Sequence, residues 1–119
     1  SGLLMRYDDL ALTKDETTGN SEYTYKTRRG RTRIYGGKVV ENVCQAVARC
    51  IIGEQMLKIA KQYRTVLTVH DSVVCCVPET EVPKAQAYIE SCMRWTPDWA
   101  AGLPVNCESG IGKSYGDCE

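Results

Sequence analysis

Residues 65–77, TVLTVHDSVVCCV, contain the pattern that decides the fold. Two runs of β-branched and apolar residues flank the polar residues 70–72. Such runs around a short polar segment predict two paired, buried strands, 66–69 and 73–77, joined by a tight turn. Pro78 has no backbone N–H to give to a sheet, so the second strand is expected to end there.

Upstream of this hairpin, a long helix is predicted from about Lys38 to Tyr63. Its apolar residues recur every three to five positions and form one stripe: Val40, Val43, Val47, Ile51, Met56 and Ile59. The opposite side carries polar residues at helical spacing: Lys38, Glu41, Gln45 and Arg49.

The remaining segments predict further strands and a second helix. Residues 22–35 are rich in Tyr, Thr and Arg, which favours strand structure interrupted near Gly30. Residues 3–12 are expected to form a strand or a hairpin, residues 82–95 a helix, and residues 103–108 a last strand. Helices packed on one face of an antiparallel sheet would make an α+β architecture.

The size and charge of the chain narrow the class of protein. Its 119 residues suit a single domain, 1–119, or one piece of a larger domain. The formal net charge of zero argues against a free-standing DNA-binding domain, because such domains are usually basic. No signal peptide, membrane span or lipidation motif is evident, and the chain begins Ser1-Gly2, so we expect a fragment whose natural protein continues upstream.

Seven cysteines occur at irregular spacing without a CxxC pair, which fits neither a zinc site nor a disulfide framework. Reduced thiols and a cytoplasmic location are therefore expected.

Asp71 is the first candidate for chemistry. A carboxylate held at a tight turn between two buried strands is well placed to bind a hard cation such as Mg²⁺. Two-metal chemistry needs carboxylates from at least two places, however, and Asp is also a common turn residue with no further role. His70, the chain's one histidine, has no neighbouring nucleophile, so the pattern leaves it open between a site residue and a surface residue.

Two polar surfaces are candidates for nucleic-acid contact. The basic residues between positions 26 and 33, Arg29 and Arg31 among them, either form a ribbon that contacts phosphates or guard a soluble edge strand. The polar face of the long helix, with Gln45 at its centre, is either solvated or contacts the acceptors that all base pairs share in the minor groove.

Three stretches together resemble the family A, DNA polymerase I-like, DNA polymerases of bacteriophages. VLTVHDSVVCCVP is similar to motif C, IYGGKVVENVCQAVARCIIGEQM to the long palm helix before it, and LPVNCESGIGKSYGDCE to the closing strand and tail. The three stretches occur in the family's order and spacing, and together they cover nearly the whole chain from about residue 22. The resemblance implies the C-terminal palm fragment of such an enzyme.

The resemblance also implies roles for matching residues. Asp71 would be one of two essential carboxylates that bind the catalytic Mg²⁺ pair, and His70 would lie near the primer terminus. Gln45 would contact the minor groove of the primer–template DNA. Lys38, Glu41 and Arg49 on the same helix face match family residues less clearly.

The chain departs from the family in two respects. Ser72 stands where the family usually has a glutamate, which puts full metal affinity in doubt. The other catalytic aspartate and the fingers helix that holds the incoming dNTP are absent, and we expect them before Ser1. The fragment is therefore expected to be inactive alone, with its metal site completed by residues outside this chain.

Two other classes of protein remain open: a stand-alone nucleic-acid-binding module with a palm-like fold, and a metal-dependent nuclease. The nuclease would need a second acid near Asp71, and the candidates are Asp8, Asp9, Glu79 and Glu108.

Overall fold

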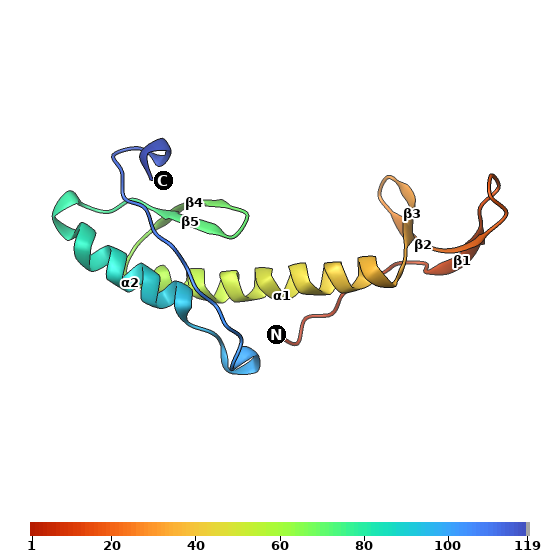
Figure 1. The fold of residues 1–119 in the computed structure, drawn as a ribbon, viewed down its shortest axis with the longest axis horizontal. Helices are drawn as coiled ribbons and strands as arrows, with labels where there is room; N and C mark the ends of the chain where they lie inside the picture. The colour runs from red at the N-terminus through yellow and green to blue at the C-terminus, as the bar shows by residue number, and fades with distance from the viewer. Residues whose placement is uncertain (119) are drawn as a thin grey trace. The chain divides into compact units, whose positions relative to one another are not determined.

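The computed structural model describes residues 1–118 and shows two α-helices and two antiparallel sheets (Figure 1). The predicted α+β class is therefore confirmed. The strands form two separate sheets, with orders β1-β2-β3 and β4-β5, where a single sheet was expected. Contacts divide the chain into two compact units, Ser1–Val47 and Ala48–Glu119, which we describe one at a time.

The first unit contains the three-stranded sheet, formed by β1 (Ala11–Lys14), β2 (Ser21–Thr27) and β3 (Gly30–Ile34). β2 is the central strand and pairs antiparallel with both neighbours. The predicted strand or hairpin over residues 3–12 is wrong for residues 3–10, which adopt no regular structure. Instead, Tyr7 packs edge-on against Tyr25 of β2 with ring centroids 5.1 Å apart, and its hydroxyl accepts a hydrogen bond from Asn42.

Helix α1 (Gly36–Ile59) follows the sheet and runs from the first unit into the second. Its bounds lie within a few residues of the prediction. The predicted apolar stripe is buried only toward its C-terminal end, where Ile51 and Ile59 are 5% and 0% exposed. Val40 and Val43, in the first unit, remain 62% and 45% exposed.

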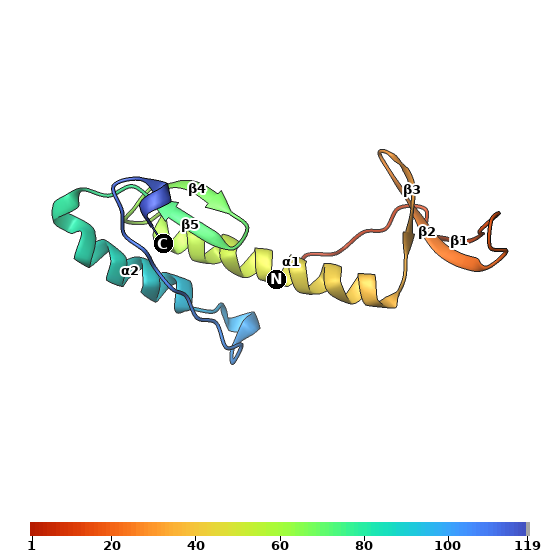
Figure 2. The ribbon, with the colours of Figure 1, turned by 45° about the horizontal axis from the view of Figure 1, so that its top comes forward.

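The second unit has the larger core, built where α2 (Val82–Arg94) lies beside the last turns of α1 (Figures 1 and 2). The buried members of this core are Ile59, Tyr63, Ala85 and Cys92. The two helices run antiparallel, because the Tyr88 hydroxyl donates to the Lys58 carbonyl, and the Gln55 amide donates to the carbonyls of Met93, near the end of α2, and Trp95, just after it.

The hairpin of β4 (Thr65–Val69) and β5 (Ser72–Cys75) covers this core with one face. Val73 and Cys75 pack against the core, and Thr68 lies directly across from Val73 on the same face. The register shifts between Thr65 and Leu67, so Val66 forms a bulge.

The prediction of two buried strands is therefore wrong, because no residue of β4 or β5 is fully buried and β4 is the more exposed of the two. Val66, Leu67 and Val69 are 53%, 45% and 36% exposed, because no second layer covers the outer face of the hairpin in the described residues.

The predicted last strand over residues 103–108 is also wrong, because this segment is extended but pairs with no strand. Gly102 enters it with φ of +84°, and Pro104 has no N–H to offer a ladder. Its polar groups bond to side chains of α2 instead. Short 3₁₀ turns complete the unit at Glu79–Glu81, Asp98–Ala100 and Tyr115–Asp117.

Neither α-helix within residues 1–118 combines the length and the apolar character that a membrane crossing requires.

Candidate functional site

The candidate catalytic residues form the turn of the β4–β5 hairpin. Val69 pairs directly with Ser72, so His70 and Asp71 alone make the connection. A two-residue hairpin turn requires a positive φ, and His70 supplies it at +54°. His is one of the few residue types besides Gly that enters this region at modest cost, which explains how the sequence closes the turn without glycine.

Asp71 is exposed at this turn, and its carboxylate has no hydrogen bond or ion pair with any residue between 1 and 118. The backbone beneath it is held firmly, because Val73 and Cys75 of β5 pack on the core. Burial raises the pKa of the Cys75 thiol, so this side chain stays a neutral packing group. The hairpin therefore presents one unpaired carboxylate from a rigid support.

The described residues do not by themselves make a magnesium site. Across residues 1–118, no group of three or more His, Cys, Asp or Glu side chains is gathered to hold a metal ion. Asp71 fits Mg²⁺ as a single carboxylate ligand, and Ser72 beside it supplies no second charge. A nuclease built from this chain alone gains no support from this arrangement.

The acidic candidates of the first unit already have partners. Asp8 forms an ion pair with Arg6, and Asp9 forms one with Arg31. Asp9 has a φ of +50°, in the left-handed region that Asp tolerates, and this conformation accompanies its contact with the neighbouring sheet.

The polar face of α1 separates into paired and unpaired side chains. In the first unit, Lys38 Nζ lies 2.9 Å from Glu41 Oε2, and this hydrogen bond raises the pKa of Lys38. Gln45 is exposed, and no partner for its amide occurs in the described chain. Arg49, which belongs to the second unit, is also exposed and forms no ion pair within residues 1–118.

The two arginines predicted to contact DNA differ in their surroundings. The Arg31 guanidinium donates to the Asp9 carboxylate, the Asp9 carbonyl and Thr24, so every one of its nitrogens is engaged. Arg29 stands in the turn between β2 and β3, where its side chain is exposed.

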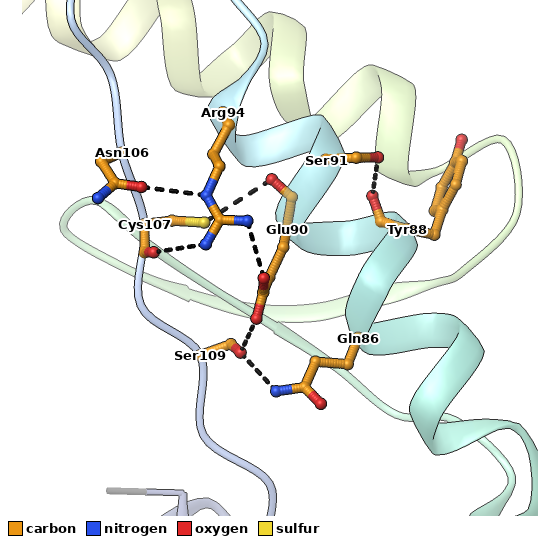
Figure 3. Close-up of polar contacts among 8 residues, drawn as sticks. All are labelled: Gln86, Tyr88, Glu90, Ser91, Arg94, Asn106, Cys107 and Ser109. Carbon is orange, nitrogen blue, oxygen red and sulfur yellow. Dashed lines mark hydrogen bonds and ion pairs between the residues drawn. The ribbon is translucent and has the colours of Figure 1, made fainter.

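A polar cluster on α2 was not predicted from the sequence (Figure 3). The Arg94 guanidinium donates to Glu90, to the Asn106 amide oxygen and to the Cys107 carbonyl. Ser109 donates to the other Glu90 oxygen and accepts from Gln86. The hydrogen bond from Ser109, with help from Arg94, lowers the pKa of Glu90.

This cluster ties residues 106–109 to the helix, and its charged groups satisfy one another. The ion pair between Glu90 and Arg94 could have been predicted from the sequence, because residues four positions apart lie next to each other on a helix. No sequence signal reveals the contacts with the tail.

The amino-acid sequence of the chain is similar to part of a known protein over nearly its whole length. No family model matches it, and no solved structure does. A protein named "DNA polymerase" from Bacillus phage SP02 is 33% identical to it over 123 residues. The alignment covers 97% of this chain but 18% of the polymerase, so the chain spans less than a fifth of that relative's length. Along almost its entire length, the chain is thus related to part of a phage DNA polymerase.

Proposed function

We propose that this chain is the part of a family A, phage-type DNA polymerase that carries one of its metal-binding aspartates, Asp71. The observation that carries the proposal is the unpaired Asp71 carboxylate in the two-residue turn of a hairpin anchored on the core. The similarity to a phage DNA polymerase over 97% of the chain supports the class of reaction. That reaction is nucleotidyl transfer from a dNTP to a primer 3′ hydroxyl, directed by a template.

The placement of Asp71 suits this role for a physical reason. A catalytic carboxylate must stay within a fraction of an ångström of its productive position, and strands locked by packing hold it better than a mobile loop. In such an enzyme, Asp71 would help to hold a Mg²⁺ pair, and that pair would supply Lewis-acid chemistry at the primer hydroxyl and at the leaving pyrophosphate. Residues 1–118 gather no group of three or more metal-binding side chains, so the proposal assigns the remaining ligands to residues outside this chain.

His70 is proposed to lie near the primer terminus. Its backbone at φ +54° starts the turn that presents Asp71, and its side chain is exposed beside that carboxylate in sequence. It is therefore a positioning residue first, because its conformation determines where Asp71 projects.

Gln45 is proposed to contact the minor groove of the primer–template duplex. Its amide is exposed and available, and the amide N–H groups can donate, as sequence-independent contact with minor-groove acceptors requires. Arg49 is a further candidate for contact with DNA. Lys38 and Glu41 satisfy each other, so a DNA contact by either would first have to break their ion pair.

Substitution of Asp71 tests the proposal. Within the longer polymerase, Asp71→Asn is expected to lower the rate of primer extension by about three orders of magnitude or more, a loss typical of removing a group that stabilises the transition state. The affinity for primer–template should change little, because Asn keeps the size of the side chain. Ser72→Ala, at the next exposed position, is the matched control and should retain extension.

The isolated chain is expected to show no primer extension, because Asp71 is the one carboxylate that it is proposed to supply to the metal site and residues 1–118 gather no complete set of metal ligands. Extension by the isolated chain would contradict the proposal, and so would full activity of the Asp71→Asn polymerase. In the second case the alternative, a non-catalytic nucleic-acid-binding module, becomes the better description.

A further inference from the structure

We infer that the turn of the β2–β3 hairpin binds backbone phosphates of DNA through Lys26, Arg28 and Arg29. The inference rests on the proposed function, which supplies DNA as the partner. It narrows the sequence-based prediction of a basic ribbon, because Arg31 is excluded and Lys26, Arg28 and Arg29 remain.

Ion pairs engage only half of the basic residues in this part of the first unit. The basic residues between positions 26 and 38 fall into two groups. Arg31, Arg33 and Lys38 each meet an acid, at 2.6, 3.0 and 2.9 Å respectively. Lys26, Arg28 and Arg29 meet none within the described residues, and all are exposed.

The positive charges of Lys26, Arg28 and Arg29 converge at the end of the β2–β3 hairpin. Thr27 pairs with Gly30, so Arg28 and Arg29 are the two residues of the turn, and Lys26 precedes it on β2. Lys26 lies directly across from Arg31, and two like charges in that position oppose strand pairing. Asp9 neutralises Arg31, but no acid offsets Lys26. The three unpaired cations therefore form one positive tip on the hairpin.

Hydrogen bonds within the β2–β3 turn order it before any ligand binds. The Thr27 hydroxyl donates to the Gly30 carbonyl at 2.7 Å and accepts from the Arg29 backbone N–H at 3.3 Å. Gly30 has a φ of +121°, which residues with a Cβ rarely adopt, and this allows the chain to enter β3 directly. A pre-ordered turn loses less conformational entropy when it binds, so its cations are effective in phosphate contact.

The salt dependence of DNA binding tests the inference. The probe is a fluorescently labelled primer–template duplex with a single-stranded overhang, titrated with the chain across a KCl series. Each phosphate contact contributes about 0.9 to the slope of log affinity against log salt for duplex, and about 0.7 for a single strand. The variant Lys26→Gln/Arg28→Gln/Arg29→Gln is expected to reduce the slope by roughly two to three.

The matched control removes the same number of charges elsewhere: Lys61→Gln/Lys84→Gln/Lys113→Gln. These lysines are exposed and form no ion pair in the described chain, so their loss tests the effect of net charge alone. The control should keep the wild-type slope. Blunt duplex and single-stranded DNA, titrated separately, identify which form supplies the phosphates. Circular dichroism checks that each variant is folded.

An equal loss of slope in both variants overturns the inference, as does an unchanged slope in the hairpin variant. Absence of measurable binding by the wild-type chain at the lowest salt also overturns it. The outcome is independent of Asp71: if Asp71→Asn leaves extension intact but the hairpin variant loses its slope, the proposed function fails and the phosphate contact stands.

Discussion

Arg31 and Asp9 are joined twice, by a 2.6 Å contact from Nη1 to the Asp9 carboxylate and a 2.7 Å contact from Nη2 to the Asp9 carbonyl. The pair fastens the segment before β1 to the edge of the sheet. The backbone N–H of Lys26 donates to the Asp8 carbonyl at 2.8 Å next to this link. Arg31 therefore acts within the first unit as a structural residue.

Substitution of Arg31 should loosen this segment. Arg31→Gln removes both contacts to Asp9 and is expected to lower the free energy of unfolding by about 1 kcal/mol, as for a well-formed but partly exposed ion pair. The Lys26 amide should exchange its hydrogen faster, since its acceptor becomes mobile. Arg31→Lys should not restore protection, because lysine cannot make the forked contact. Unchanged exchange at Lys26 would show that the link has no structural role.

Gln55 is the buried polar side chain of the second unit, 0% exposed, and it donates to the Met93 and Trp95 carbonyls at 2.7 and 2.9 Å. Gln55→Met keeps the volume but leaves both carbonyls without their donor. We expect a loss of about 2 kcal/mol in the free energy of unfolding, measured by urea denaturation. Gln62→Met, at an exposed position after α1, is the matched control and should stay within about 0.5 kcal/mol of wild type.

The cluster around Glu90 should make the attachment of the tail depend on pH. The folded pKa of Glu90 is lowered, chiefly by the hydrogen bond from Ser109. The stabilisation is therefore complete above the ordinary pKa of a glutamate and is lost as pH falls through the lowered folded value. The NMR resonances of Asn106, Cys107 and Ser109, followed through that acidic range, should move toward random-coil values as Glu90 is protonated.

Glu90→Gln is the control for this effect. It should move the same tail resonances toward random-coil values already at neutral pH and remove most of their dependence on pH. If wild type and variant respond to acid in the same way, another group is responsible.

His70 provides a test of conformation at the turn. Its φ of +54° suits Gly and is strained for a β-branched residue. His70→Val is expected to cost roughly 1–2 kcal/mol in the free energy of unfolding, whereas His70→Gly should stay within about 0.5 kcal/mol of wild type. In the longer polymerase, His70→Gly then separates the two roles: retained extension assigns His70 to the turn alone, and lost extension assigns a function to its imidazole.

Much of the fold could be predicted because local signals agree with it. The β-branched runs around positions 70–72 predicted the hairpin, and its observed strands begin and end within about two residues of that prediction. Helical periodicity found both α1 and α2. These elements place Asp71 at a turn, which could therefore be predicted from the sequence.

The contacts that assign roles to side chains could not be predicted. The segment 103–108 alternates like a strand, but Asn106 and Cys107 accept hydrogen bonds from the Arg94 side chain, which no periodicity reveals. Among the clustered basic residues, composition could not show that Asp9 engages Arg31 and leaves Arg29 unpaired. The bulge at Val66 also could not be predicted from alternating inward and outward side chains, because it places both Thr65 and Thr68 on the covered face.

That bulge also bears on how the chain behaves at high concentration. A flat, apolar strand at the edge of a sheet recruits copies of itself and seeds aggregation. β4 has exposed Val66, Leu67 and Val69, which would make it such a template if it were regular. The extra residue twists the strand and interrupts the row of free backbone groups that a second molecule would need. Deletion of Val66 should therefore make the chain more prone to form intermolecular β-structure.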